Sequence, residues 1–306
     1  MDSIEPRKKN KPLAVFLTLL VILSSSILVY ESVGYSTGGR NRPAVISISS
    51  DDGFASVYRI AFPIFKERGI PATVFVIATE IGFPGHFNLS QLTEMQDNGW
   101  EIGSHAMHHV KLTTLNETAL SNEVVESKQL LMSHGFNVSS FAYPFSDINE
   151  NVVKVVSNNY VVARLTAGPD DYIGYYPEIV KKEEFVVKAM SAVTDFQTIR
   201  RNIDTAIERH EWINFYFHGV EKDAKIDENL SWTLADMADY IKEKVDMGLL
   251  RTMTFIGAFE YFKNLVHFYG PFQTLNNINL LESVANPYSR EAEFLPSPNR
   301  FSGVTS

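Results

Sequence analysis

The sequence predicts an α/β fold in which a mainly parallel sheet is covered by helices. Seven short apolar runs rich in β-branched residues alternate with segments of helical spacing along residues 44–264. Several of these runs are too apolar to have a solvated face, which is typical of parallel strands buried on both sides. About seven such strands suit a barrel, so one large α/β domain is expected from the 306 residues.

The expected elements follow one another along the chain, beginning with a β-α-β unit whose helix ends at Gly69. Strands are expected over residues 44–50, 72–79, 100–106, 139–145, 160–167, 212–219 and 250–256. Helices are expected over residues 56–69, 91–99, 119–135, 149–159, 195–210 and 231–248. Beyond residue 264 the periodicity fades into a stretch rich in Asn, Ser and Pro, which predicts a C-terminal appendage, partly disordered, over 265–306.

An uncharged apolar run over residues 13–30 follows a basic cluster at Arg7, Lys8, Lys9 and Lys11. As a helix this run would be about 27 Å long, at 1.5 Å per residue, and the hydrocarbon core of a bilayer is about 30 Å thick. The basic residues before it predict a cytoplasmic N-terminus and an exported remainder.

The organisation expected from this run is a basic tail over 1–11, a transmembrane anchor over 12–33, a linker over 34–43 and the α/β domain over 44–264. A cleaved signal segment, which would give a secreted protein, is the alternative, and a buried core helix is the third interpretation. The first two interpretations both place the α/β domain outside the cytoplasm.

Charge and composition limit the partners. The formal net charge of -9 and the pI near 5.4 lack the basic excess of a nucleic-acid groove, so no nucleic-acid partner is expected. The chain has no cysteine. Any protein-bound metal must therefore be held by His, Asp or Glu.

Polar residues stand where the predicted strands end, which is where reactive groups collect in parallel α/β folds. His105 and His109 are four residues apart, so in a helical turn they would face the same way and share one cation, while His108 would point away. Paired histidines are also common on surfaces, so this spacing alone is weak evidence.

Asp51 and Asp52 end the first predicted strand. Adjacent carboxylates repel each other unless a cation lies close by, and a divalent ion would meet that need. One of them can bind the metal together with the two histidines, and the other can accept a proton from water. The alternative is an ordinary Asp-Asp-Gly turn that caps a helix. His218, at the end of an apolar strand, is the candidate general acid, although a lone histidine is more often structural.

In this order the motifs resemble those of the polysaccharide deacetylase family, the NodB-homology domain of carbohydrate esterase family 4. The family's T-F-D-D-G motif is similar to Ser49–Gly53, and its paired-histidine motif to His105–His109. Its R-x-P-Y/F motif is similar to Ala142–Phe145, and its last strand ending in His to Phe215–His218. The resemblance covers residues 44–262 and implies a distorted (β/α)7 barrel that removes N-acetyl groups from an amino-sugar polymer.

The resemblance also implies a role for each residue. Asp51 corresponds to the base and His218 to the acid, while Asp52, His105 and His109 correspond to the metal ligands. The metal would be Zn²⁺, or Co²⁺, Mn²⁺ or Ni²⁺, since two imidazoles and a carboxylate accept several ions.

The third motif implies the substrate side of the site. By the resemblance, Tyr143 and Phe145 contribute to substrate and oxyanion binding, through a backbone N–H near Phe145. Tyr143, Phe145, Trp212 and Phe54 are also the aromatic residues that could line a sugar-stacking groove, with Phe145 the preferred one.

Two departures from the family pattern concern the groups that tune the base and the acid. The arginine of the third motif is Ala142 here, and Arg164 is the residue that could reach the same space. The family's Asp-Trp pair has no match, since Asp170 and Asp171 lie in that region without a tryptophan.

Two other functions remain open for such a barrel. One is hydrolysis of another non-peptide amide bond, and the other is glycan binding without catalysis. An exported domain argues against small metabolites as substrates. A complete set of base, acid and ligands argues against a pure binding module.

Overall fold

The computed structural model describes residues 42–176, 180 and 183–269. The chain divides into two units, residues 1–264 and 265–306, and the fold that follows is that of the first. The predicted anchor over 12–33 and residues 270–306 of the predicted appendage lie outside the described residues. Within the described ranges, no helix combines the length and the apolar character needed to cross a membrane.

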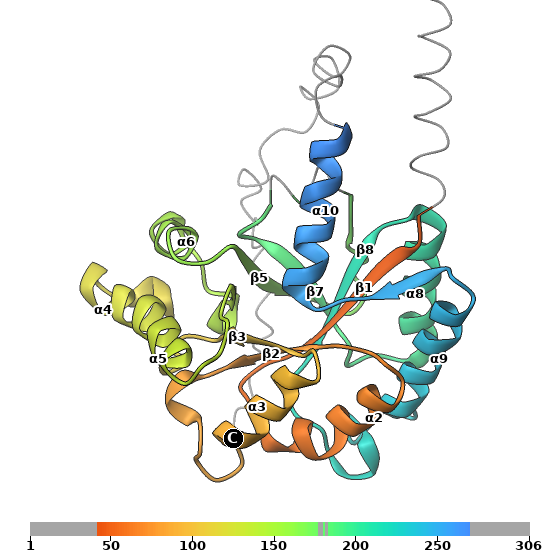
Figure 1. Ribbon diagram of the computed structural model, residues 1–306, viewed down its shortest axis with the longest axis horizontal. Helices are drawn as coiled ribbons and strands as arrows, with labels where there is room; N and C mark the ends of the chain where they lie inside the picture. Colours follow the sequence, from red (N-terminus) through yellow and green to blue (C-terminus); the bar gives the residue numbers. More distant parts are fainter. Residues whose placement is uncertain (1–41, 177–179, 181–182, 270–306) are drawn as a thin grey trace, which may run out of the picture. The chain divides into compact units, whose positions relative to one another are not determined.

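The strands form a closed parallel barrel, as predicted. Across the described residues, nine strands belong to one sheet, and all but β6 and β9 form a parallel ring that is closed by the pairing of β8 with β1. The ring strands are β1 (Ala44–Ser50), β2 (Thr73–Val76), β3 (Glu101–Ser104), β4 (Ser140–Ala142), β5 (Val162–Ala167), β7 (Val187–Ser191) and β8 (Trp212–Phe217). Figure 1 shows these strands at the centre of the unit with helices around them.

One ring strand differs from the prediction. The predicted seventh strand, 250–256, yields only β9 (Leu250–Thr252), which pairs with the amino half of β1 outside the ring. The ring instead uses β7, which was not predicted, between β5 and β8. The two-residue strand β6 (Gly174–Tyr175) pairs antiparallel with the start of β8. The ring is therefore distorted, because β7 contacts β8 only near its carboxyl end.

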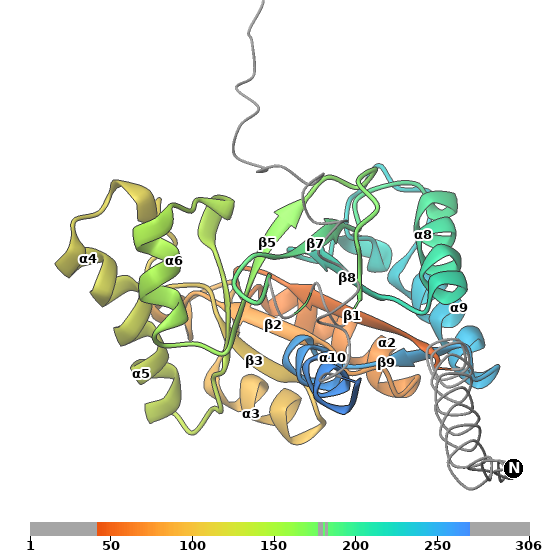
Figure 2. The same ribbon diagram turned by 90° about the horizontal axis from the view of Figure 1, so that it is seen from above.

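Helices cover the outside of the ring (Figures 1 and 2). The α-helices are α2 (Phe62–Glu67), α3 (Leu89–Asp97), α4 (Glu117–Ser121), α5 (Ser127–Ser133), α6 (Glu150–Ser157), α8 (Phe196–Arg209), α9 (Leu234–Asp246) and α10 (Phe255–Tyr269). Two π-helical segments, η1 (Val57–Ala61) and η4 (Asn122–Glu126), interrupt the predicted helices, and the short 3-10 segments are η2 (Ala78–Glu80), η3 (Leu112–Thr114), η5 (Pro144–Ser146) and η6 (Lys222–Ala224). Side-chain caps fix several helix starts, as Asn88 does for α3.

The amino-terminal end of the barrel is filled by α10, a helix that was not predicted. Phe255, Phe259 and Phe262 pack in one cluster with Val45 and Trp212, which lie near the starts of β1 and β8. These side chains are at most 1% exposed, so α10 closes this end with an apolar core. The open end of the barrel is therefore the carboxyl end, where the candidate residues lie.

Candidate active site

Asp52, His105 and His109 converge at the carboxyl end of the barrel. The Oδ1 atom of Asp52 lies 3.5 Å from Nε2 of His105 and 3.5 Å from Nε2 of His109. The three ligand-type atoms lie within 4.8 Å of one another. Asp52 follows β1 and the histidines follow β3, so the ring places residues that are more than fifty positions apart beside one another.

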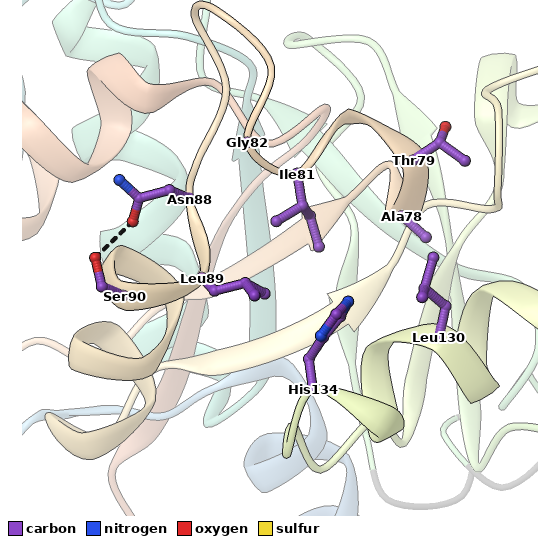
Figure 3. Close-up of a pocket in the computed structure, with 9 residues that line it drawn as sticks. All are labelled: Ala78, Thr79, Ile81, Gly82, Asn88, Leu89, Ser90, Leu130 and His134. Atoms are coloured by element: carbon purple, nitrogen blue, oxygen red, sulfur yellow. Dashed lines mark hydrogen bonds between the residues drawn. The ribbon is translucent and has the colours of Figure 1, made fainter.

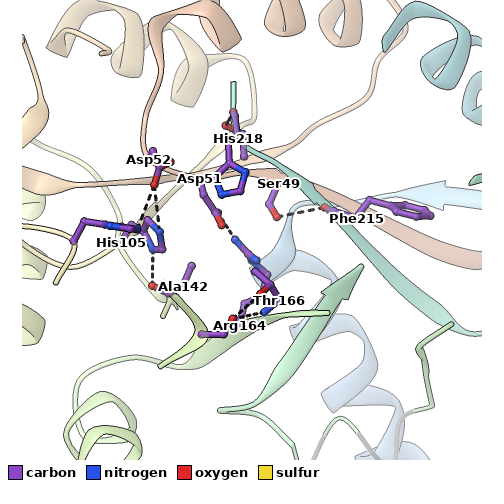
Figure 4. A network of polar contacts seen from close by, with 12 residues as sticks. Ser49, Asp51, Asp52, His105, Ala142, Arg164, Thr166, Phe215 and His218 are labelled. Carbon is purple, nitrogen blue, oxygen red and sulfur yellow. Dashed lines mark hydrogen bonds and ion pairs between the residues drawn. The ribbon is translucent and has the colours of Figure 1, made fainter. Parts of the chain in front are cut away.

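The donor set fits a divalent cation. Two imidazoles and one carboxylate are the ligands of many catalytic zinc sites, which leave further coordination positions free. Asp52 Oδ1 is buried and has no hydrogen-bond partner among the described residues. A buried carboxylate oxygen without a partner is costly, and a cation would satisfy it. The Nδ1–H of His105 donates to the carbonyl of Ala142, 2.7 Å away, which directs Nε2 toward Asp52 (Figure 4).

Left-handed backbone turns, rather than a helix, direct these side chains. Residues 105–109 form a loop, so the helical turn predicted to align the two histidines is absent. Asp52, Ala106 and His109 have φ values of 68°, 65° and 54°. Such values are uncommon for residues other than glycine and tend to occur at functional sites. His108 points away from the ligands, as predicted, and pairs with Glu123 at 2.7 Å.

Asp51 lies beside the metal-type ligands and is only 2% exposed. Its carboxylate forms a buried ion pair with Arg164, which enters the barrel from β5 (Figure 4). Burial by itself raises the pKa of Asp51, but Arg164, His105 and His218 together hold it below its usual value. Arg164 is the register partner of Ala142 on the adjacent strand, and its side chain reaches the candidate base Asp51.

The guanidinium of Arg164 lies between two aromatic rings. Its central carbon is 4.8 Å from the ring centroid of Phe75 and 5.3 Å from that of Tyr216. These contacts compensate part of the desolvation of a side chain that is 1% exposed. Sequence reasoning identified Arg164 but not the two rings that hold it, because both lie in apolar strand runs without any distinguishing signal.

His218 lies at the end of β8, beside Asp51, and is exposed at the mouth of the barrel (Figure 4). Its ring makes an edge contact with Tyr216, with the centroids 5.7 Å apart. The Ser50 hydroxyl donates to the His218 carbonyl at 3.0 Å, which fixes the backbone there. Asp170 and Asp171 are both exposed beyond β5.

The third motif separates into one exposed and one buried aromatic ring. Phe145 is 60% exposed, and its ring centroid lies 4.4 Å from that of His109, so it can meet a substrate at the metal-type ligands. Tyr143 is 2% exposed, and its hydroxyl donates to the Phe185 carbonyl at 3.1 Å. The Tyr143 ring is therefore core, which corrects its prediction as a substrate contact. Trp212 is also core, at 0% exposed.

A separate surface hollow of about 600 Å³ contains none of these residues (Figure 3). Ile81, Leu89 and Leu130 line it together with His134. Its wall includes Ala78 and Thr79, whose backbone N–H groups also donate to carbonyls of the loop that carries His105 and His109. Its lack of clustered titratable groups distinguishes this hollow from the candidate active site.

The chain matches known proteins over the part that holds most of the site. Residues 38–162 match the polysaccharide deacetylase family model, and this stretch includes Asp51, Asp52, His105 and His109 but neither Arg164 nor His218. YxkH of Bacillus subtilis (strain 168), assigned by name to the polysaccharide deacetylases, is 31% identical over 126 residues, which are 40% of this chain and 45% of that protein. The poly-beta-1,6-N-acetyl-D-glucosamine N-deacetylase of Staphylococcus epidermidis is 31% identical over 144 residues, 42% of this chain and 50% of that one.

The chain thus spans about half the length of these curated relatives. A solved structure, the peptidoglycan deacetylase PdaC from Bacillus subtilis, superposes with a TM-score of 0.50 at 16% identity, and covers 75% of this chain and 96% of that chain. That similarity concerns the fold. The matched segment confirms the predicted resemblance to the polysaccharide deacetylase family, over residues 38–162.

Proposed function

We propose that the domain is a metal-dependent hydrolase that removes N-acetyl groups from an amino-sugar polymer. The observation that carries this proposal is the pairing of two different carboxylates at one site. Asp51 is held ionised by Arg164, and the neighbouring Asp52 faces two imidazoles. This arrangement provides a base beside a cation site, which metal-assisted amide hydrolysis uses.

Asp52, His105 and His109 would hold the cation, for which Zn²⁺ is the first choice and Co²⁺, Mn²⁺ or Ni²⁺ are alternatives. When bound, a divalent cation supplies Lewis acidity that polarises an amide carbonyl and makes water more acidic. Burial lowers the pKa of His105, which favours the neutral imidazole that a metal needs.

The proton steps fall to Asp51 and His218. Because its pKa is lowered, the Asp51 carboxylate stays charged and can accept a proton from the attacking water. His218 lies on the solvent side of Asp51 and can donate a proton to the amine that leaves. The water oxygen forms a bond to the acetyl carbon, the carbon–nitrogen bond breaks, and acetate and a free amine result.

Substrate contact is proposed for Phe145. Its exposed ring beside His109 can stack on a sugar, and the left-handed turn at Phe145 and Ser146, with φ of 57° and 54°, can present a backbone N–H to the oxyanion. The Ser146 hydroxyl is fixed by Thr166, 2.6 Å away on β5. The names of the staphylococcal relatives favour a polymer of N-acetylglucosamine as the substrate.

We also propose that residues 12–33 anchor the chain, with the catalytic domain outside the cytoplasm. The support is the apolar run over 13–30 and the basic residues before it. Membrane fractionation and protease accessibility of the full chain in cells test this proposal. A full-length chain found in the membrane, with the domain cut only from outside, agrees with it; a truncated chain in the medium would instead support a cleaved signal.

The activity is tested by acetate release from N-acetylglucosamine oligomers, with the full chain in mild detergent. We expect release that a chelator abolishes and added Zn²⁺ or Co²⁺ restores. The variant Asp52→Asn should lose this release, while Asp97→Asn, an exposed change on α3, should not. Wild-type protein that binds metal but releases no acetate from any oligomer would contradict the proposal and point to another amide or to binding alone.

A further inference from the structure

The loop that carries His105 and His109 is fastened from three sides. From the β2 side, the Ala78 N–H donates to the Ala106 carbonyl at 3.1 Å, and both the N–H and the hydroxyl of Thr79 donate to the Met107 carbonyl, at 3.2 and 2.6 Å. From the β4 side, the Ala142 carbonyl meets His105. The third side is the segment η4, which contributes the only carboxylate among these contacts.

That carboxylate belongs to Glu123, which is 8% exposed. Its Oε2 accepts from the backbone N–H of His108 at 2.9 Å and from that of Met107 at 3.2 Å. Its Oε1 lies 2.7 Å from Nδ1 of His108. The two backbone N–H groups belong to the residues between the candidate ligands, so one side chain fixes the middle of the metal-binding loop.

The backbone of Glu123 takes part as well. Its carbonyl accepts a hydrogen bond from the N–H of Met107, a loop residue that does not belong to the helix, at 3.1 Å. Glu123 lies in the π-helical segment η4, which interrupts the helix between α4 and α5. Single π-helical turns inside helices often occur at functional sites, because the extra residue redirects side chains and carbonyls. Here the turn presents both the carbonyl and the carboxylate of Glu123 to the loop.

We propose that Glu123 is a positioning residue for the metal ligands His105 and His109, acting through the backbone of Met107 and His108. This inference rests on the proposed metal site. The loop holds two residues, Ala106 and His109, in left-handed conformations that it would not keep without outside contacts. Charge-assisted hydrogen bonds to a buried carboxylate are the strongest of the contacts that oppose its relaxation.

The proposal is tested by metal affinity in five full-length proteins in mild detergent. They are the wild type, Glu123→Ala, Glu123→Gln, His108→Ala and the control Glu126→Gln, which changes an exposed residue of the same π-helical segment. Zn²⁺ affinity is measured by competition with a chromophoric chelator. The absorption spectrum of the Co²⁺ form reports ligand geometry, and thermal unfolding of the metal-free proteins reports stability.

We expect Glu123→Ala to bind Zn²⁺ about 10 to 100-fold more weakly and to change the Co²⁺ spectrum, as changes of residues that orient metal ligands do. Glu123→Gln should fall between it and the wild type, because the amide oxygen still accepts from the backbone. His108→Ala should have a smaller effect, since both backbone bonds remain, and Glu126→Gln should match the wild type.

Two results would overturn the inference, and they are distinguishable. If Glu123→Ala unfolds at lower temperature but, while still folded, binds Zn²⁺ with wild-type affinity and spectrum, Glu123 is a structural brace alone. If the wild type itself binds neither ion, the proposed metal site fails and the inference fails with it.

Discussion

Asp51 and Glu101 are buried carboxylates at opposite ends of the barrel, and their surroundings differ. Asp51, at the carboxyl end, faces the cation Arg164 and two histidines, and its pKa is lowered. Within the described residues, Glu101, at the start of β3, accepts from three donors, all neutral: the Thr73 hydroxyl, the Ser140 hydroxyl and the Ile256 N–H. Burial raises the pKa of Glu101 even though these donors favour the charged form.

The contrast shows how one barrel separates chemistry from stability. At the carboxyl end, left-handed turns and a carboxylate oxygen of Asp52 that has no hydrogen-bond partner in the described part of the chain leave groups ready to bind a ligand. At the amino end, Glu101 accepts a hydrogen bond from the first turn of α10, and the apolar face of that helix fills the barrel. Changes at the first end should alter turnover, whereas changes at the second should alter the free energy of unfolding and leave turnover as it is.

The largest effect on stability is expected from replacing Arg164, the charged group that distinguishes the surroundings of Asp51 from those of Glu101. Arg164→Leu leaves Asp51 buried without its ion pair, and losing one partner of a buried pair costs about 3–5 kcal/mol. The second change Asp51→Asn in the same chain should recover part of this loss. Denaturant unfolding of the single and double variants measures it. Additive losses in the double variant would show that the pair does not act as a unit.

A smaller effect is expected from overpacking the interior between the two ends. A Cβ added at Gly103 would lie 2.5 Å from the ring of Phe75 and 2.8 Å from the Ser140 hydroxyl. Phe75 is fully buried and cannot move away, so Gly103→Ala should lower stability by about 1–3 kcal/mol. Because Phe75 also touches Arg164, turnover should fall as well. Gly99→Ala, which has open space but a φ of 84°, separates backbone strain from overpacking in the same unfolding measurement.

The smallest effect is expected at Glu101. Glu101→Gln keeps the shape of the side chain, so stability near neutral pH should change by no more than about 1 kcal/mol. Since burial raises the folded-state pKa, the stabilising contribution of wild-type Glu101 is complete below its unfolded value and declines as the pH rises through the folded value. The other charged group that acts on it is Glu260, which raises the pKa further.

The free energy of unfolding of the wild type should therefore fall, relative to Glu101→Gln, as the pH increases above about 4.5. Urea unfolding of both proteins across the pH range measures this difference. Parallel curves would mean that Glu101 ionises as it does in the unfolded chain. Turnover of the variant should equal that of the wild type, since Glu101 lies at the opposite end from Asp51.

The sequence predicted which strand ends carry the candidate active-site residues, but it did not predict which elements close the barrel. Residues such as Asp52 and His105 carry a chemical signal at the end of an apolar run, and parallel strands bring such ends together. The strand β7 has no such signal, because it follows the charged segment 181–184 and alternates only weakly. The helix α10 begins within the segment that was predicted to be a strand, since apolar runs of that length fit both.

Within the site, the sequence pointed to the reacting groups but not to their supports. Arg164 was a candidate because the third motif has Ala142 in place of its arginine, and Arg164 could reach the same space. Glu123 gave no signal, because a glutamate in a polar-faced helix is ordinary until the π-helical turn directs it at a distant loop. Tyr143 was wrongly predicted to contact substrate, because the sequence does not show whether an aromatic residue within a motif is buried or exposed.

The central claim is that Asp51 is a base beside a separate metal site. The most direct test measures Zn²⁺ binding and acetate release from N-acetylglucosamine oligomers in Asp51→Asn and in the wild type. We predict the same metal stoichiometry in both proteins and a loss of turnover of about 100-fold or more, as expected for a general base. Wild-type turnover in a folded, metal-loaded Asp51→Asn protein would contradict the account.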